Sequence, residues 1–180
     1  MSESMLPKPK KSVALSGVAA GNTAICTVGL SGNDLHYRGY DIADLANNAS
    51  FEEVAHLLIH EHLPNQAELS AYQIKLARLR GLPAPLKAAL ELLPAGTHPM
   101  DVMRTGASVL GTVLPEKHDH AAPGARDVAD RLLASFGSIL LYWYHFSHHG
   151  KRANVAQDER VAVGALRAFG HGNVAAGTGF

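Results

Sequence analysis

Histidine is the residue of this sequence best suited to metal binding or proton transfer near neutral pH, and the chain contains 11 of them. His56 and His60 are four residues apart in a segment of helical periodicity, so they share one helix face, which is the spacing of paired zinc ligands. His62 follows two residues later. No glutamate follows His56, which excludes the zinc-protease motif. We therefore favour a polar rim on an amphipathic helix over a zinc site.

Two further histidine groups occur, one in a loop and one at the end of a long predicted helix: His118 and His120, and His145, His148 and His149. The loop pair lies beside Glu116 and Asp119, a composition typical of a solvated loop. Protonated histidines are favoured at helix C-termini by the helix dipole. We interpret the second group as helix-end electrostatics and the first as loop surface.

A cysteine, a glycine-rich triplet and an apolar run are the remaining candidate groups. Cys26 has no base beside it in the sequence, which disfavours a nucleophile. Gly170-His171-Gly172 neither follows a predicted strand nor precedes a predicted helix, so it is a poor phosphate loop. The apolar run Leu132–Phe146 could line a ligand pocket, although such a stripe more often forms core or a subunit interface. Spacing alone therefore yields no catalytic set.

Composition excludes several classes of protein. The 16 Lys and Arg residues balance 16 Asp and Glu residues, so no overall field attracts nucleic acid or an anionic membrane. An apolar content of 47% with no net charge excludes a disordered chain. The run Leu132–Phe146 is about 15 residues long, short of the ~20 that span a bilayer. Cys26 is the single cysteine and cannot form an internal disulfide, which indicates a cytoplasmic protein.

Helix signals dominate the chain from residue 41 onward. Ser50 with Glu53, and Asn65 with Glu68, have the spacing of capping boxes, in which a helix start exchanges two hydrogen bonds with its own side chains. The expected elements are a hairpin formed by 23–28 and 35–38, helices starting at Asp41, Ser50, Asn65, Pro85 and Pro99, a long helix over 125–149 and a weak helix over 158–169.

These elements predict an all-α fold with a small β-hairpin near the N-terminus, organised in three parts. Residues 1–22 form a flexible N-terminal arm, and residues 23–152 form an incomplete helical domain. Residues 153–180 are rich in small residues and form a divergent, poorly ordered tail.

Several stretches of the sequence resemble one known family. Residues 37–40 read Tyr-Arg-Gly-Tyr, a signature found widely in citrate synthases. Further stretches of the same resemblance are 8–17, 21–24, Leu35–Ile42, Phe51–Leu58, Leu63–Pro64, His98–Gly106 and Leu140–His145. Together they resemble the 2-methylcitrate synthase branch of the citrate synthase family, in register over about residues 8–152.

The resemblance implies the N-terminal part of the family's large helical domain, and a homodimer. It implies condensation of propionyl-CoA, or less efficiently acetyl-CoA, with oxaloacetate. In the family an aspartate removes the α-proton of the thioester as a general base, and two histidines stabilise the enol and protonate the carbonyl. No metal or other cofactor is implied.

The family's catalytic segments are absent from these 180 residues. Phe169–Gly172 echoes one of them, but its neighbours differ, so we assign no catalytic, cofactor-binding or metal-binding residue. We expect a truncated form that is inactive alone; the alternative is a non-catalytic helical oligomerisation module or a pseudogene-like fragment. The residues expected at a subunit interface, or in the core behind it, are Val102, Leu110, Leu133, Phe136, Leu140, Trp143 and Phe146.

Overall fold

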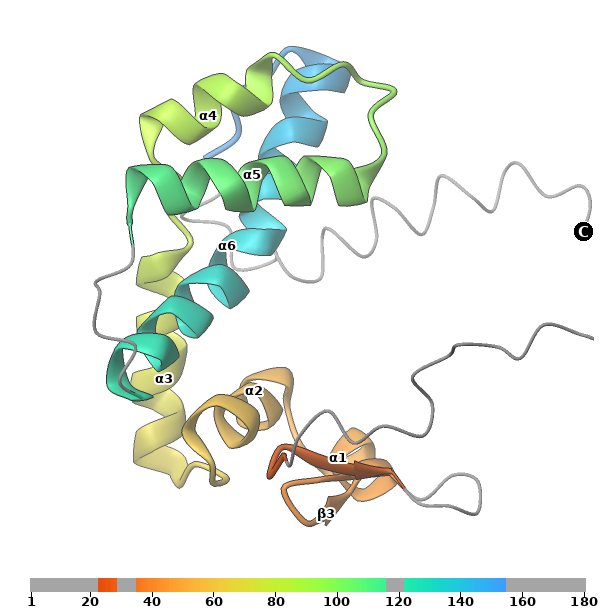
Figure 1. The fold of residues 1–180 in the computed structure, drawn as a ribbon, viewed down its shortest axis with the longest axis vertical. Helices are drawn as coiled ribbons and strands as arrows, with labels where there is room; N and C mark the ends of the chain where they lie inside the picture. Colours follow the sequence, from red (N-terminus) through yellow and green to blue (C-terminus); the bar gives the residue numbers. More distant parts are fainter. Residues whose placement is uncertain (1–22, 29–34, 116–121, 155–180) are drawn as a thin grey trace, which may run out of the picture.

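Helices packed around one long helix make up most of the described structure (Figure 1). The computed structural model describes residues 23–28, 35–115 and 122–154. In this part of the chain the elements are β1 (Cys26–Val28), β2 (Leu35–Tyr37), β3 (Tyr40–Asp41), α1 (Ile42–Asn48), α2 (Phe51–His60), α3 (Gln66–Leu79), α4 (Ala84–Glu91), α5 (Pro99–Val113) and α6 (Ala122–His149). The predicted helical fold with a small sheet near the N-terminus is thus confirmed. The predicted arm 1–22 and the weak helix over 158–169 lie outside the described residues.

The small sheet has three antiparallel strands in the order β1-β2-β3. Cys26 pairs with Tyr37 across β1 and β2, and Tyr37 pairs with Tyr40 across β2 and β3. Arg38 and Gly39 connect β2 to β3 with φ angles of 48° and 91°, the left-handed pair that a two-residue hairpin turn of this kind requires. The prediction of a two-strand hairpin missed β3 because Arg-Gly lacks the Asn or Asp that usually marks such a turn.

Side-chain caps set where α2 and α3 begin, as the sequence predicted. Ser50 Oγ accepts a hydrogen bond from Glu53 N–H at 3.3 Å, and the Glu53 carboxylate accepts one from Ser50 N–H at 2.7 Å. Asn65 and Glu68 make the same reciprocal pair, at 3.0 and 2.8 Å. Each box satisfies amide groups that a helix start otherwise leaves without partners.

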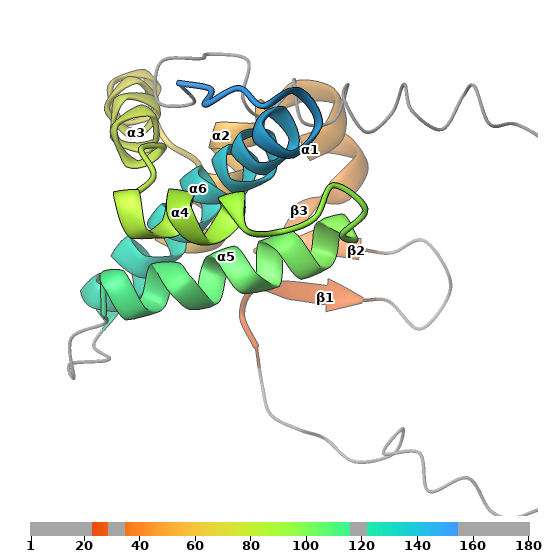
Figure 2. The same cartoon turned by 90° about the horizontal axis from the view of Figure 1, so that it is seen from above.

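The long helix α6 packs against α2, α3, α4 and α5 (Figure 1). It begins at Ala122, slightly earlier than the predicted 125–149. Its C-terminal half shares the main apolar cluster with α4 and α5, which lie side by side (Figure 2). The buried members of this main cluster are Leu82, Leu86, Leu90, Val102, Leu110, Ile139, Leu141, Tyr142 and Trp143. None of the described helices is both long and apolar enough to cross a membrane.

A smaller apolar cluster joins α6 to α2 and α3. Its buried members are Ala55, Tyr72 and Leu76, and Leu133 and Ala134 of α6 pack against them. The run Leu132–Phe146 is therefore covered from more than one side, as its all-round apolar character predicted.

Gly106 allows α5 and α6 to cross closely. A Cβ placed on Gly106 would lie 2.7 Å from Ile139 Cγ2 and 3.1 Å from Ile139 Cδ1. Ile139 is fully buried in the main cluster, where close packing leaves it little room to move. Gly111 of the same helix has no atom within 4 Å of such a Cβ. Only the first glycine is required by packing.

Replacing Gly106 with Ala is expected to destabilise the fold, whereas the same change at Gly111 is expected to stabilise it slightly. Overpacking at Gly106 costs about 1–3 kcal/mol. That cost exceeds the gain of up to ~1 kcal/mol from replacing a glycine within a helix. Urea unfolding midpoints of the two variants measure the difference, and equal midpoints would contradict the close crossing.

Candidate functional site

A buried carboxylate joins three helices in the first half of α6. Asp130 is fully buried. Its oxygens accept hydrogen bonds from Tyr72 Oη at 2.8 Å, from Lys75 Nζ at 2.7 Å and from His60 Nε2 at 3.1 Å. These donors compensate the cost of removing the negative charge from water. Asp130 therefore fastens α2 and α3 to α6.

Tyr72 and Lys75 reach this carboxylate together because residues three apart lie on one helix face. Burial and then the hydrogen bond to Asp130 raise the pKa of Tyr72 well above its usual range, so the phenol keeps its proton. Burial alone would lower the pKa of Lys75, but its bonds to Asp127 and Asp130 outweigh burial and raise it. The cluster is thus a fixed ion pair. The sequence pattern does not pair these residues, since its local signal is only a charged residue just before an apolar run.

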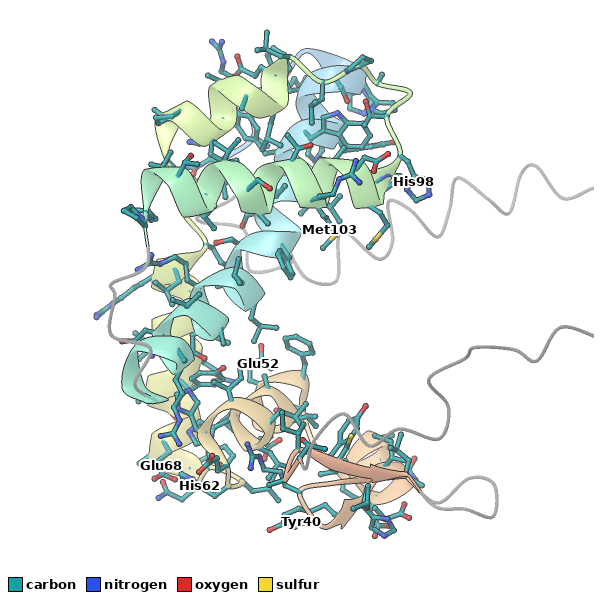
Figure 3. All side chains as sticks on the ribbon, in the orientation of Figure 1. Tyr40, Glu52, His62, Glu68, His98 and Met103 are labelled. Atoms are coloured by element: carbon teal, nitrogen blue, oxygen red, sulfur yellow. The ribbon has the colours of Figure 1, made fainter. Side chains whose placement is uncertain are left out.

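The structure brings His56, His60 and His62 together, and we call them the histidine group. The ring centroid of His56 lies 4.7 Å from that of His60 and 4.9 Å from that of His62. His56 Nδ1–H donates to the His62 carbonyl oxygen at 2.9 Å, and His62 Nδ1–H donates to the His60 carbonyl oxygen at 3.0 Å. His56 is only 8% exposed, so the predicted polar rim is wrong for this residue. It holds for His62, which lies beside Glu68 (Figure 3).

Hydrogen bonds to Asp130 of α6 and to carbonyl oxygens at the end of α2 account for the arrangement of the histidine group. His56 uses Nδ1 for a carbonyl oxygen and His60 uses Nε2 for a carboxylate. Within residues 23–28, 35–115 and 122–154, no three metal-ligating side chains converge. Burial, opposed by Asp130, lowers the pKa of His60 below its ordinary value. The zinc alternative gains no support from this arrangement.

A second polar cluster lies near the other end of α6. Glu91, the last residue of α4, accepts hydrogen bonds from Tyr142 Oη at 2.6 Å and from Arg152 Nε and Nη2 at 2.8 Å each. Paired bonds of this kind match the guanidinium fork to the carboxylate. The bonds from Arg152 and then Tyr142 lower the pKa of Glu91 to about 2. The cluster ties the chain that follows α6 back onto α4.

The C-terminal end of α6 carries the predicted group of histidines around Tyr144. The ring of Tyr144 lies 5.9 Å from His145, 4.4 Å from His148 and 5.6 Å from His149. Trp143 lies in the main cluster, where it is 2% exposed, and its ring also meets that of His148, with centroids 5.6 Å apart. The aromatic run therefore joins the main cluster to the histidines at the end of the helix. His118, His120 and the 170–172 triplet lie outside the described residues.

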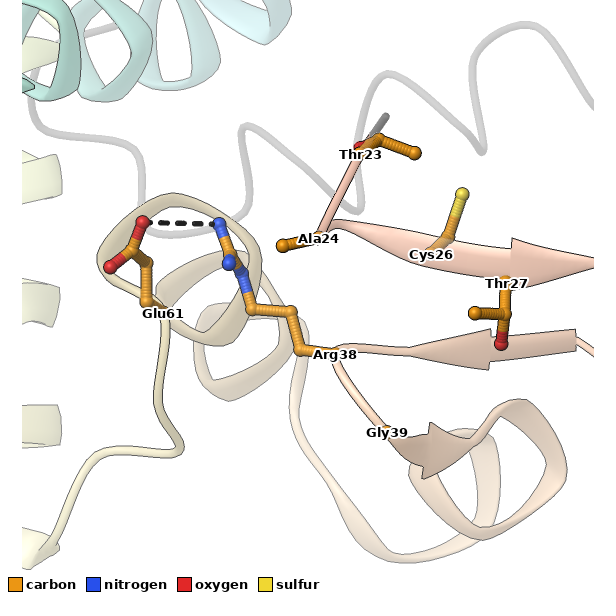
Figure 4. Close-up of a pocket in the computed structure, with 7 residues that line it drawn as sticks. All are labelled: Thr23, Ala24, Cys26, Thr27, Arg38, Gly39 and Glu61. Carbon is orange, nitrogen blue, oxygen red and sulfur yellow. Dashed lines mark ion pairs between the residues drawn. The ribbon is translucent and has the colours of Figure 1, made fainter. Parts of the chain in front are cut away.

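Cys26 lines a pocket of about 270 Å³ beside the sheet (Figure 4). The other lining residues are Thr23, Ala24, Thr27, Arg38, Gly39 and Glu61. The charged groups of the pocket are paired, because Arg38 Nη2 lies 3.6 Å from a Glu61 oxygen. Arg38 Nη2 also donates to the Leu58 carbonyl oxygen at 3.1 Å. No histidine is among the lining residues that the structure describes, so the pocket offers Cys26 no imidazole base.

The sequence matches the model of one known family over most of its length. Residues 14–174 match the family model described as "Citrate synthase, C-terminal domain". The chain belongs to the citrate synthase family. The match extends beyond residue 152, at which the resemblance seen in the sequence motifs ends.

Two curated relatives are much longer than this chain, which matches only part of each of them. A 2-methylcitrate synthase from Shewanella oneidensis is 54% identical over 145 residues, which are 81% of this chain and 38% of that relative. The 2-methylcitrate synthase 2 of Corynebacterium glutamicum is 40% identical over 126 residues, 70% of this chain and 33% of the relative. The chain thus spans little more than a third of the length of these relatives.

Solved citrate synthases share the fold. The enzyme from Thermotoga maritima aligns with a TM-score of 0.63 and 26% identity, over 84% of this chain and 43% of that chain. The enzyme from Thermoplasma acidophilum, solved as a ternary complex with carboxymethyl coenzyme A and oxaloacetate, aligns with a TM-score of 0.62 and 17% identity. That alignment covers 83% of this chain and 44% of that chain. The family fold implied by the sequence resemblance is confirmed.

Replacing Asp130 with Asn is expected to lower the free energy of unfolding by about 1–3 kcal/mol, because the buried amide nitrogen would face the Lys75 and His60 donors and leave a buried hydrogen bond unmade. Asp127→Asn is the matched control. Asp127 contacts the same ammonium at 2.8 Å but is 68% exposed, so its loss is expected to cost less than about 1 kcal/mol. Urea denaturation followed by circular dichroism measures both. Similar losses for the two variants would argue against a buried anchor.

Glu91 is expected to contribute stability at neutral pH that is lost in acid. Its folded pKa of about 2 lies below the ordinary 4.5, so the contribution is present above pH 4.5 and disappears as the pH falls from 4.5 toward about 2. Glu91→Gln should therefore be less stable than wild type at pH about 6 and approach it near pH about 2.5. Urea midpoints over this range give the difference. A constant difference between the two proteins would refute the assignment.

Proposed function

We propose that these residues are the N-terminal part of a 2-methylcitrate synthase, whose whole form condenses propionyl-CoA, or less efficiently acetyl-CoA, with oxaloacetate. The 54% identity to the Shewanella oneidensis 2-methylcitrate synthase carries this proposal. The complex of the Thermoplasma acidophilum citrate synthase with carboxymethyl coenzyme A and oxaloacetate supports the choice of partners. The protein is cytoplasmic under this proposal, in keeping with the single Cys26.

Within such an enzyme these residues serve as scaffold. Condensation needs a base for the α-proton of the thioester and donors for the enolate, all within hydrogen-bond reach of the substrates. The two carboxylates at the polar clusters described above are already in ion pairs, Asp130 with Lys75 and Glu91 with Arg152. Neither pair lines the pocket beside the sheet. We therefore propose no catalytic, cofactor-binding or metal-binding residue for the condensation in this chain.

The purified 180-residue chain is expected to release no coenzyme A thiol above background from propionyl-CoA and oxaloacetate. The assay follows free thiol colorimetrically, with the Shewanella oneidensis enzyme as the positive control. Turnover that His171→Ala abolishes would contradict the scaffold role and place chemistry near the 170–172 triplet.

A chimera supplies the positive arm of the same test. Residues 8–152 of this chain replace the matching stretch of the Shewanella oneidensis enzyme. If these residues are the scaffold of a 2-methylcitrate synthase, the chimera condenses propionyl-CoA at a rate within about tenfold of the parent, a barrier change below ~1.4 kcal/mol. A folded chimera without activity would count against the proposal.

A non-catalytic helical oligomerisation module is the second candidate. The residues expected at an interface divide into two sets in the structure: Val102, Leu110 and Trp143 are buried within the chain, whereas Leu133, Phe136, Leu140 and Phe146 remain partly exposed along α6. We propose that these side chains form one apolar patch along α6, which a two-fold axis would pair with the same patch of a second copy.

The chain is expected to form a dimer or larger species at tens of micromolar. Sedimentation velocity measures this, and Leu140→Asp, which puts a charge in the apolar stripe of α6, should lower the oligomeric state or prevent folding. Ile74→Asp is the control, because Ile74 is 55% exposed on α3 and outside that stripe. A compact monomer of the unmodified chain would refute association through α6.

A further inference from the structure

The last turn of α6 carries a second pair of histidines four residues apart. His145 and His149 share one helix face, and their ring centroids lie 6.0 Å apart. His149 is exposed and His145 is half-buried, so solvent reaches the pair. Two metal–nitrogen bonds of about 2.0–2.1 Å at a tetrahedral angle place imidazole centroids roughly 5 Å apart, so the two rings need to approach by only about 1 Å. Rotation of the exposed His149 side chain is enough for that approach.

The backbone and one aromatic ring hold this pair in place. Lys151 N–H donates to the His145 carbonyl oxygen at 3.2 Å across Gly150, whose φ of 64° ends the helix. The ring of Tyr144 stands nearly perpendicular to both imidazoles, at 77° to His145 and 79° to His149. Both rings are therefore kept on one side of the helix end before any ligand arrives, which lowers the entropy cost of binding.

The ring nitrogens of this pair are open to a ligand, in contrast to those of the same-spaced pair in α2. His56 Nδ1 is bonded to a carbonyl oxygen, and His60 Nε2 is bonded to Asp130. No hydrogen bond within the described part of the chain engages a ring nitrogen of His145 or His149. The spacing typical of paired metal ligands is thus used for hydrogen bonding in α2 and left free at the end of α6.

His148 lies in the same turn but differs from the pair. Its Nδ1 lies 2.9 Å from Ser147 Oγ and 3.2 Å from the Tyr144 carbonyl oxygen, and its ring stacks on that of Tyr144 with centroids 4.4 Å apart. A ring engaged in this way is poorly placed to become a third ligand. His148 is therefore a matched control for the pair.

Electrostatics at this helix end favour a cation. The last carbonyl oxygens of α6 give its C-terminus a partial negative charge. Arg152 does not occupy this position, because its guanidinium is bonded to Glu91 of α4 at 2.8 Å. Lys151 is exposed, so water and salt screen its charge.

We propose that His145 and His149 form a two-imidazole chelate site for a divalent transition-metal ion, namely Ni²⁺, Zn²⁺ or Cu²⁺. Imidazole suits these ions, whereas Mg²⁺ prefers oxygen ligands. The site has two protein ligands, in keeping with the lack of any converging group of three among the described residues, and water completes the coordination shell. This inference is independent of the proposed function, since no step of the condensation uses the site.

Calorimetric titration of the untagged 180-residue chain with NiCl₂ at pH about 7.5, where imidazole is available as a ligand, tests the proposal. We expect the tightest class of sites to hold one Ni²⁺ per chain. His149→Gln is expected to weaken this class by about tenfold or more, because one imidazole alone loses the benefit of chelation. His148→Gln should bind Ni²⁺ like wild type, and MgCl₂ should give no binding heat. Unchanged binding in His149→Gln, or an equal loss in His148→Gln, would overturn the site.

Nuclear magnetic resonance of the wild-type chain gives a readout that does not depend on the variants folding. Paramagnetic Ni²⁺ broadens signals close to it, and α2 lies at the opposite end of the described fold from the C-terminal end of α6 (Figure 1). At less than one Ni²⁺ per chain, the ring signals of His145 and His149 are expected to broaden first, together with that of their neighbour His148. The signals of His56 and His60 should persist. Broadening that begins in α2, or that affects all histidines at the same Ni²⁺ concentration, would overturn the proposal.

Discussion

The need to cover a helix of 28 residues that is apolar on several faces is the constraint on which the rest of this structure depends. Water cannot be kept from such a helix by one neighbour alone, so α2, α3, α4 and α5 all pack on α6. Gly106 permits one of these crossings, because any Cβ there would overlap Ile139. Of the polar groups that α6 carries into its packed faces, Asp130 and Tyr142 bond to neighbouring helices, whereas Ser138 Oγ and Trp143 Nε1 have no hydrogen-bond partner among the described residues.

The two ends of α6 are covered by different kinds of contact. The main cluster is apolar and large, with a polar pair at its edge where Glu91 meets Arg152. The cluster under α2 and α3 is small, and a buried carboxylate lies at its side. Burying an ion pair costs desolvation free energy, and the attraction between the charges offsets this cost only while every partner stays in place. The packing of α2 and α3 on α6 therefore depends on Asp130 keeping its partners.

Local signals predicted much of this fold from sequence, and long-range partners are what they missed. The capping boxes at Ser50 and Asn65 are contacts between residues three apart, so the sequence contains both partners of each box. The bonds from Tyr72 and Lys75 to Asp130 join residues 58 and 55 apart, and nothing in a local pattern pairs them. The same limit applies to the candidate site. Helical spacing placed His56 and His60 on one face, but it could not show that this face packs against Tyr72 of α3.

Family membership and chemistry rest on different observations here. The match over residues 14–174 and the shared fold establish the citrate synthase family. The groups that the structure brings together serve to join helices, and this supports the scaffold role proposed for these residues.

The central claim is that these residues fold around α6, and Trp143 reports on it directly. It is the single tryptophan of the chain and lies in the main cluster, 2% exposed. Urea unfolding of the wild-type chain, followed at once by tryptophan emission and far-ultraviolet circular dichroism, is the decisive measurement. We expect blue-shifted emission in buffer and a single cooperative transition that coincides for both probes. Emission typical of a solvent-exposed tryptophan in buffer, with no cooperative transition, would contradict the account.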